Sequence, residues 1–119
     1  MSLQALEQQL KDQKSAIELR DMAIKLAKNT EFRKLILEGF CGTEAARYVQ
    51  ASGDPALNAV QRADALAIAQ ASGHFKRYMS VLLQMGQAAE NQIADLEEAI
   101  EEARREEEII IDPEETGAA

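Results

Sequence analysis

The stretch that decides the fold runs from Phe75 to Ala103 and reads FKRYMSVLLQMGQAAENQIADLEEAIEEA. Apolar or small residues recur along it at alternating intervals of four and three residues, through four heptads. This spacing puts them on one stripe of an α-helix and is the pattern of a coiled-coil seam. We therefore predict a long helix whose seam packs against another helix. The seam residues are Phe75, Met79, Leu82, Gly86, Ala89, Ile93, Leu96, Ile100 and Ala103.

A second long helix is predicted near the start of the chain, over residues 3–28. Polar residues, Gln13 and Arg20, interrupt its apolar stripe. This stripe can cover the C-terminal seam within one chain, and a second chain can do the same. Because one helix alone would leave its seam in water, we expect a homo-oligomer that uses both seams. The N-terminal seam residues, Leu3, Leu10, Ile17 and Ile24, recur every seven residues.

Short helices are expected between the two long ones, in a corner at about residues 31–55. The spacing of apolar residues predicts one helix at about 31–38, ended by Gly39 and Gly42. Thr43 is a suitable N-cap for another helix at about 44–51.

The start of the second long helix is predicted from Asp54 and Pro55, because an N-cap Asp followed by Pro is a helix start signal. From Pro55 to about Glu108 the sequence favours one continuous helix, and a break at Gly73 is the alternative. Small residues from Ala63 to Gly73 predict close packing of this part against the short helices.

The composition agrees with an all-α fold. Apolar residues make up 46% of the 119 residues and aromatic residues only 4%, while strong helix formers dominate. One cysteine excludes an internal disulfide, and the absence of a long apolar run predicts no membrane span and no signal peptide. We predict one helical domain over residues 1–108, followed by an acidic tail over 109–119. Within the domain, residues 1–28 are the coiled arm, 30–73 the helical corner and 74–108 the coiled-coil helix.

The charge of the chain is concentrated at its C-terminal end. Residues 1–89 hold 11 basic and 9 acidic side chains, whereas residues 90–119 hold 2 basic and 12 acidic ones. This acidic end is either a solvated, solubilising segment or an electrostatic arm for a basic partner. Within it, Ile109, Ile110 and Ile111 form a β-prone run, which is either a frayed terminus or an extended peptide that docks on a partner.

Residues with catalytic or metal-binding chemistry are sparse. Cys41 and His74 are the only cysteine and histidine, so they cannot supply a zinc-ligand set, and no glycine-rich nucleotide-binding motif is present. Cys41 is expected to be a small buried apolar group. The glutamates between Glu97 and Glu108 flank the apolar seam as solvated charges, and a charged helix exterior offers no pocket to shift their pKa values. We expect no enzyme, no cofactor and no metal.

A DNA-binding alternative comes from the Thr43–Arg47 stretch, TEAAR, which is typical of the first helix of a helix-turn-helix unit. The helix that would follow carries Asn58, Gln61 and Arg62, and then becomes rich in alanine. Recognition of DNA would rest on Arg47 and Arg62, because few other cations lie nearby. In this alternative, residues 43–62 form a degenerate helix-turn-helix; nucleic acid is not the expected partner but stays open as one.

The order of segments resembles a known group of proteins. A coiled arm is followed by NTEFRKLILEGF, AARYV, DPAL, RADALAIAQASGHFKRYM and an acidic coiled end. Over residues 1–108 this order resembles small helical proteins encoded among the head and packaging genes of tailed bacteriophages. The resemblance implies a non-enzymatic component of virion assembly or structure, of scaffold or connector type. Its partners would be virion or assembly proteins, in the host cytoplasm during assembly or in the virion.

Two alternatives to that function stay open. The same group includes the small terminase subunit, which packages DNA and has a helix-turn-helix end and a helical oligomerisation core. The other alternative is an adaptor or assembly chaperone that presents its acidic tail to a partner.

Overall fold

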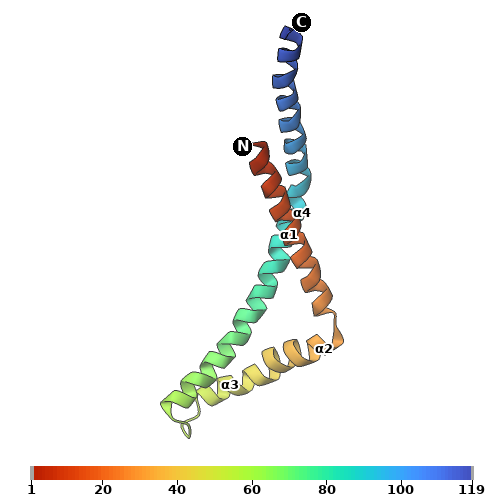
Figure 1. The fold of residues 1–119 in the computed structure, drawn as a ribbon. Helices are drawn as coiled ribbons and strands as arrows, with labels where there is room; N and C mark the ends of the chain where they lie inside the picture. Colours follow the sequence, from red (N-terminus) through yellow and green to blue (C-terminus); the bar gives the residue numbers. More distant parts are fainter. Residues whose placement is uncertain (1, 119) are drawn as a thin grey trace. The chain divides into compact units, whose positions relative to one another are not determined.

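The structure is a computed structural model that describes residues 2–118, with side chains described for residues 2–109. All regular secondary structure in the described residues is helical, which confirms the all-α prediction (Figure 1). A long N-terminal helix and a long C-terminal helix flank a shorter helical segment, as predicted. The elements are α1 (Leu3–Ala27), α2 (Thr30–Phe32), the π-helix η1 (Arg33–Glu44), α3 (Ala45–Ser52) and α4 (Ala59–Ala118).

These elements form two compact units, which we describe separately. Unit 1 contains α1 up to Arg20 and α4 from Met85 onward. Unit 2 is the intervening chain, Asp21–Gln84.

Unit 1 is an antiparallel helix pair. Three cross-helix contacts run in opposite directions along the two segments: Glu7 with Arg104, Gln13 with Gln92, and Arg20 with Glu90. The core between the segments consists of the predicted seam of α4. Its most buried members are Gly86, Ala89, Leu96 and Ile100.

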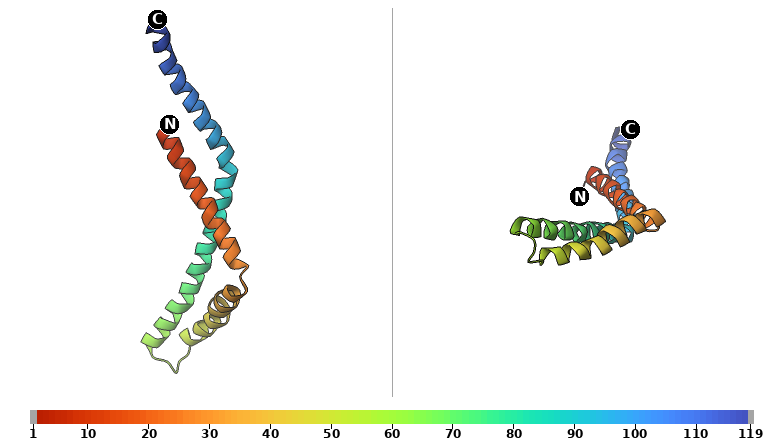
Figure 2. Two further views of the ribbon diagram at one scale, coloured as in Figure 1. Left: turned by 45° about the vertical axis from the view of Figure 1, so that its right-hand side comes forward. Right: turned by 90° about the horizontal axis from the view of Figure 1, so that it is seen from below.

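Unit 2 places the run from α2 through η1 to α3 beside the first part of α4 (Figure 2). The rings of Phe32 and Phe75 lie 6.1 Å apart between their centroids and tilt by 48°. Buried Cys41 on η1 has its sulfur 3.9 Å from the carbonyl oxygen of Ser72 on α4. These contacts hold the two helical segments together mainly through small and aromatic side chains.

The predicted break at Gly39 and Gly42 is wrong, because the chain is helical without interruption from Thr30 to Ser52. A glycine ends a helix most readily in the left-handed region, and no glycine in the described residues has a positive φ. Residues Arg33–Glu44 instead continue in the wider π-helical form, and Thr43 lies inside that segment rather than capping a new helix. A π-helix this long is unusual, since most are single-turn bulges.

Asparagines cap the start of this run and the start of α4. Asn29 accepts a 2.8 Å hydrogen bond from the backbone N–H of Phe32 and so caps α2. The predicted start of the second long helix at Asp54–Pro55 is wrong, because Asn58 and Gln61 cap α4 reciprocally. The backbone N–H of Gln61 donates to the Asn58 side chain at 2.8 Å, and that of Asn58 donates to the Gln61 side chain at 3.0 Å.

Helix α4 is continuous through Gly73, so the alternative with a break there is wrong. The helix also runs past Glu108, its predicted end, to Ala118. The backbone of Ile109–Ile111 is helical in the structure, and not extended as the docking alternative supposed. The helix continues through Pro113, although proline in a helix interior removes one hydrogen bond and costs about 3 kcal/mol.

Candidate protein-interaction surfaces

The seam of unit 1 buries the side chains that the sequence singled out on α4. Leu96 and Ile100 are 7% and 4% exposed, and Ile93 is half-buried one turn before Leu96. Opposite them on α1, Leu3, Leu10 and Ile17 are also half-buried. The predicted seams thus pack within one chain here, in the antiparallel arrangement that the sequence left open.

Polar groups mark the sides of this seam. The Arg104 guanidinium donates to the Glu7 carboxylate at 3.0 Å, and the Gln13 side-chain amide donates to the Gln92 oxygen at 3.4 Å. The Arg20 guanidinium pairs with the Glu90 carboxylate, and the Arg20 side chain is only 13% exposed. Its methylene stem crosses Gly86, where a side chain would leave it no room. The two residues that interrupt the N-terminal seam in the sequence therefore supply specific cross-helix contacts.

The N-terminal seam shifts its register where unit 2 begins. Ala23 is 3% exposed, whereas the predicted seam residue Ile24 is 37% exposed. In the seven-residue repeat, the buried residue after Arg20 would be Ile24, four positions later. In the structure it is Ala23, three positions later. The prediction that Ile24 lies in the buried seam is wrong for this reason.

The core of unit 2 is built from small side chains. Ala23, Cys41, Ala65 and Ser72 are its buried members, which confirms the expected burial of Cys41 and of part of the alanine-rich stretch. The larger predicted seam residues Phe75, Met79 and Leu82 are only half-buried. No large side chain among residues 2–109 is fully buried.

Unit 2 also leaves many large apolar side chains in water. Leu35 on η1 is 70% exposed, Val49 on α3 is 55% exposed and Val60 on α4 is 69% exposed. The helices of unit 2 therefore do not cover all of the large apolar side chains that the unit carries. The exposed large apolar side chains of this unit are Met22, Ile24, Leu26, Leu35, Val49, Val60, Leu66, Ile68, Tyr78 and Leu83.

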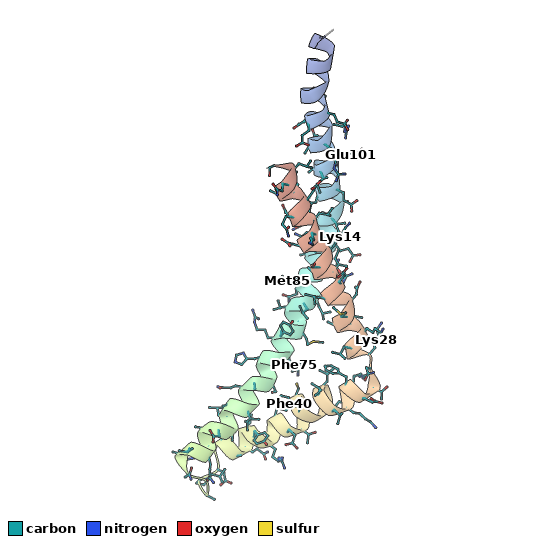
Figure 3. The ribbon with its side chains drawn as sticks, viewed as in Figure 1. Lys14, Lys28, Phe40, Phe75, Met85 and Glu101 are labelled. Carbon is teal, nitrogen blue, oxygen red and sulfur yellow. The ribbon has the colours of Figure 1, made fainter. Side chains whose placement is uncertain are left out.

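An apolar pocket of about 390 Å³ lies within unit 2. Three elements form it: the end of α1, the residue Leu37 of η1, and one face of α4. Two lysines line it, Lys28 just after α1 (Figure 3) and Lys76 on α4. Sequence reasoning missed this pocket, because it depends on how three segments meet. Its remaining lining residues are Ala23, Ile24, Ala27, Met79, Ser80 and Leu83.

The residues of the DNA-binding alternative lie at the far end of unit 2. Arg47 is exposed on α3, where the Glu44 carboxylate accepts its hydrogen bond at 2.5 Å, and its guanidinium lies 5.7 Å from the centre of the Tyr48 ring. The hydrogen bond and charge of Glu44 raise the pKa of Arg47. Arg62 is half-buried near the start of α4. DNA contact by Arg47 and Arg62 stays a prediction.

The connection between these two arginines differs from a helix-turn-helix turn. Residues 53–58 join α3 to α4, and the two helices lie side by side in both views of Figure 2. In a helix-turn-helix unit, a turn of three or four residues joins helices that cross at about 90–120°. The segment is therefore closer to an αα-hairpin.

The C-terminal isoleucines are only partly described. Ile109 is 64% exposed on the helical surface. The side chains of Ile110 and Ile111 lie outside the described residues, so the docking role assigned to this run stays a prediction.

The described residues were compared with two kinds of site, a metal-ligand group and a membrane-spanning helix. Among the described residues, no group of three or more histidine, cysteine or carboxylate side chains can hold a metal ion. None of the helices described contains a segment long and apolar enough to cross a bilayer. Comparison of the chain with protein-family models, curated proteins and solved structures found no match in any of the three.

Proposed function

We propose that this is a non-enzymatic helical assembly protein that acts through protein–protein contacts, beginning with contacts between copies of itself. The observation that carries the proposal is the incomplete burial of unit 2. Ten large apolar side chains of this unit are at least partly in water, while its core holds only small residues. A contiguous exposed apolar patch of more than a few hundred Å² commonly marks an interaction site.

The energetics support the same conclusion. Burial of apolar surface contributes about 25 cal/mol per Å² removed from water. Unit 2 gains only part of this stabilisation within one chain, because its fully buried side chains are small and larger ones such as Phe75 and Met79 are only half-buried. Contact with another chain would cover residues such as Leu35, Val49 and Val60 and supply the missing burial.

The biological setting of the proposal comes from the sequence pattern. The segment order resembles small helical proteins of tailed-bacteriophage head and packaging genes, and such proteins work by assembly rather than catalysis. We therefore propose a role in virion assembly or structure, with other assembly or virion proteins as partners.

The test is the mass of the full chain in solution. Multi-angle light scattering across a concentration series should give a mass above that of the 13.1 kDa monomer at micromolar concentration. The mass should fall on dilution if association is reversible. A strict monomer throughout the series would overturn the proposal that the chain associates with itself.

A further inference from the structure

The pocket of unit 2 has a chemistry that specifies its occupant. Its interior is apolar, formed by faces of α1 and α4 and by Leu37. Ile24 and Leu83, which line it, are 37% and 41% exposed, so its apolar wall continues to the protein surface. The charged residues that line it, Lys28 and Lys76, are both cations. A matching ligand is an apolar group flanked by negative charge.

The chain itself contains a segment of this kind. Residues 106–115 read EEEIIIDPEE, in which three consecutive isoleucines are flanked by six acidic residues and no basic one. Ile109, the first of the three, is 64% exposed and therefore available for contact. The unit that holds the pocket carries the opposite balance, with eight basic and six acidic side chains over residues 21–84.

The segment must reach the pocket from another copy of the chain. Lys76 and Ile109 belong to the same continuous helix, 33 residues apart (109 minus 76). A continuous helix cannot fold back to bring two of its own residues together. Contact between Ile109 and Lys76 therefore requires a second molecule.

We propose that the pocket lined by Lys28, Leu37 and Lys76 binds the Ile109–Ile111 segment of a second copy of the chain. Isoleucine side chains on one face of this helical segment enter the apolar interior, and flanking carboxylates face the two lysines. Each copy then donates one segment and receives one. The proposal rests on the proposed function, because it names one of the contacts through which the chain associates with itself.

Cross-linking of the full chain tests the contact directly. In a Cys41→Ser background, one chain carries Ser80→Cys in the pocket and a second, tagged chain carries Ile109→Cys. Mixing them under mild oxidation should give a disulfide-linked heterodimer. The control replaces Ser80→Cys with Ala67→Cys, at an exposed position of α4 outside the pocket lining. Docking raises the local thiol concentration, so the pocket pair should react at least about tenfold faster than the control pair.

A second variant tests the apolar part of the contact. Changing Ile109, Ile110 and Ile111 to serine removes the isoleucine side chains, while the helix propensities of serine and isoleucine are similar. The concentration at which half of the protein is associated should rise by about ten- to a hundredfold, which corresponds to the loss of one buried isoleucine. Changing Glu106, Glu107 and Glu108 to glutamine should weaken association less, and only at low salt.

The outcomes separate this proposal from the proposed function. If the wild-type chain self-associates, but the pocket pair reacts no faster than the control pair and the serine variant keeps its mass, the docking proposal is overturned while self-association stands. A small amphiphile that copurifies with the protein and blocks the reaction of Ser80→Cys would also overturn it, because the pocket would then belong to that ligand. A strictly monomeric wild-type chain overturns both proposals.

Discussion

Units 1 and 2 of this molecule pack helices in different ways. Unit 1 pairs two helical segments along a seam of regular spacing, and its buried side chains include Leu96 and Ile100. Unit 2 combines a π-helix with α-helices, and its buried residues are small: Ala23, Cys41 and Ala65 among them. Small side chains allow helices to approach closely, but each removes little apolar surface from water.

This difference suggests separate roles for the two units, one in the stability of the single chain and the other in association. A regular seam with large apolar residues stabilises a helix pair without further partners, as in unit 1. In unit 2 the small residues face inward, and large apolar residues such as Leu35 and Val60 remain outside. We infer that unit 1 contributes more to the stability of the single chain, and that unit 2 offers the surface for association.

The largest effect is expected from a charge placed in the seam of unit 1. Ile100 is 4% exposed, and Ile100→Asp would place a carboxylate in the apolar seam and remove a large apolar side chain. We expect a loss of about 3–5 kcal/mol in the free energy of unfolding. Urea unfolding followed by circular dichroism at the helix band measures this loss.

The matched control places the same residue on the outer face of the same segment. Ala94 is exposed, so Ala94→Asp should lower the free energy of unfolding by only about 0.5 kcal/mol, through helix propensity. Equal losses for Ile100→Asp and Ala94→Asp would show that the seam does not stabilise unit 1.

The seam was also the part of the fold that the sequence predicted best. Between Gly86 and Ala103 the heptad spacing identified the inward-facing residues correctly, because a regular repeat defines one face of a helix whatever its partner. The end of α4 was misplaced, because the predicted end was about Glu108, whereas the helix runs through Pro113 to Ala118. Local sequence signals do not show whether a long helix continues past a proline.

The corner was harder to predict for a different reason. Two glycines near the middle of η1 and the Asp54–Pro55 pair are strong local signals, and both were overridden. The signal that did set the start of α4 is the Asn58–Gln61 pair, a capping box that was present in the sequence and overlooked. The pocket of unit 2 had no local signal, since its walls come from three separate segments.

A smaller effect is expected where α1 and α4 approach most closely in unit 1. A Cβ added at Gly86 would lie 2.8 Å from Cγ of Arg20 and closer still to its Cβ. The Arg20 guanidinium is held by Glu90, so its stem is not free to move aside. We expect Gly86→Ala to lower the free energy of unfolding by about 1–3 kcal/mol, the usual range for overpacking.

Gly73, on the same helix in unit 2, is the matched control for Gly86. A Cβ at Gly73 meets no atom within 4 Å. Gly73→Ala should therefore raise the free energy of unfolding by about 0.5–1 kcal/mol, because alanine is the better helix former. If the close approach is confined to Gly86, urea unfolding should show changes in the free energy of unfolding of opposite sign for the two variants. A stabilising Gly86→Ala would refute the tight packing of α1 against α4.

The smallest effect concerns the π-helix, the feature that most distinguishes unit 2. A Cβ at Gly39 would lie 2.9 Å from the Lys34 carbonyl oxygen, a backbone atom that can move only with the helix. At Gly42 the nearest atom, the Leu37 carbonyl oxygen, would be 3.6 Å away, an ordinary contact. Gly39→Ala should lower the free energy of unfolding by about 1 kcal/mol, and Gly42→Ala should raise it by up to about 1 kcal/mol.

The sign for Gly39→Ala decides what maintains the π-helix. The two variants change the same residue type within the same segment, so helix propensity contributes equally to both, and thermal unfolding can compare them. If only Gly39→Ala lowers the free energy of unfolding, the wide π-helical turn requires a residue without a side chain at position 39. A gain at both positions would mean that η1 relaxes into an α-helix without penalty. The irregularity of unit 2 would then lie in its small, incompletely covered core and not in its backbone.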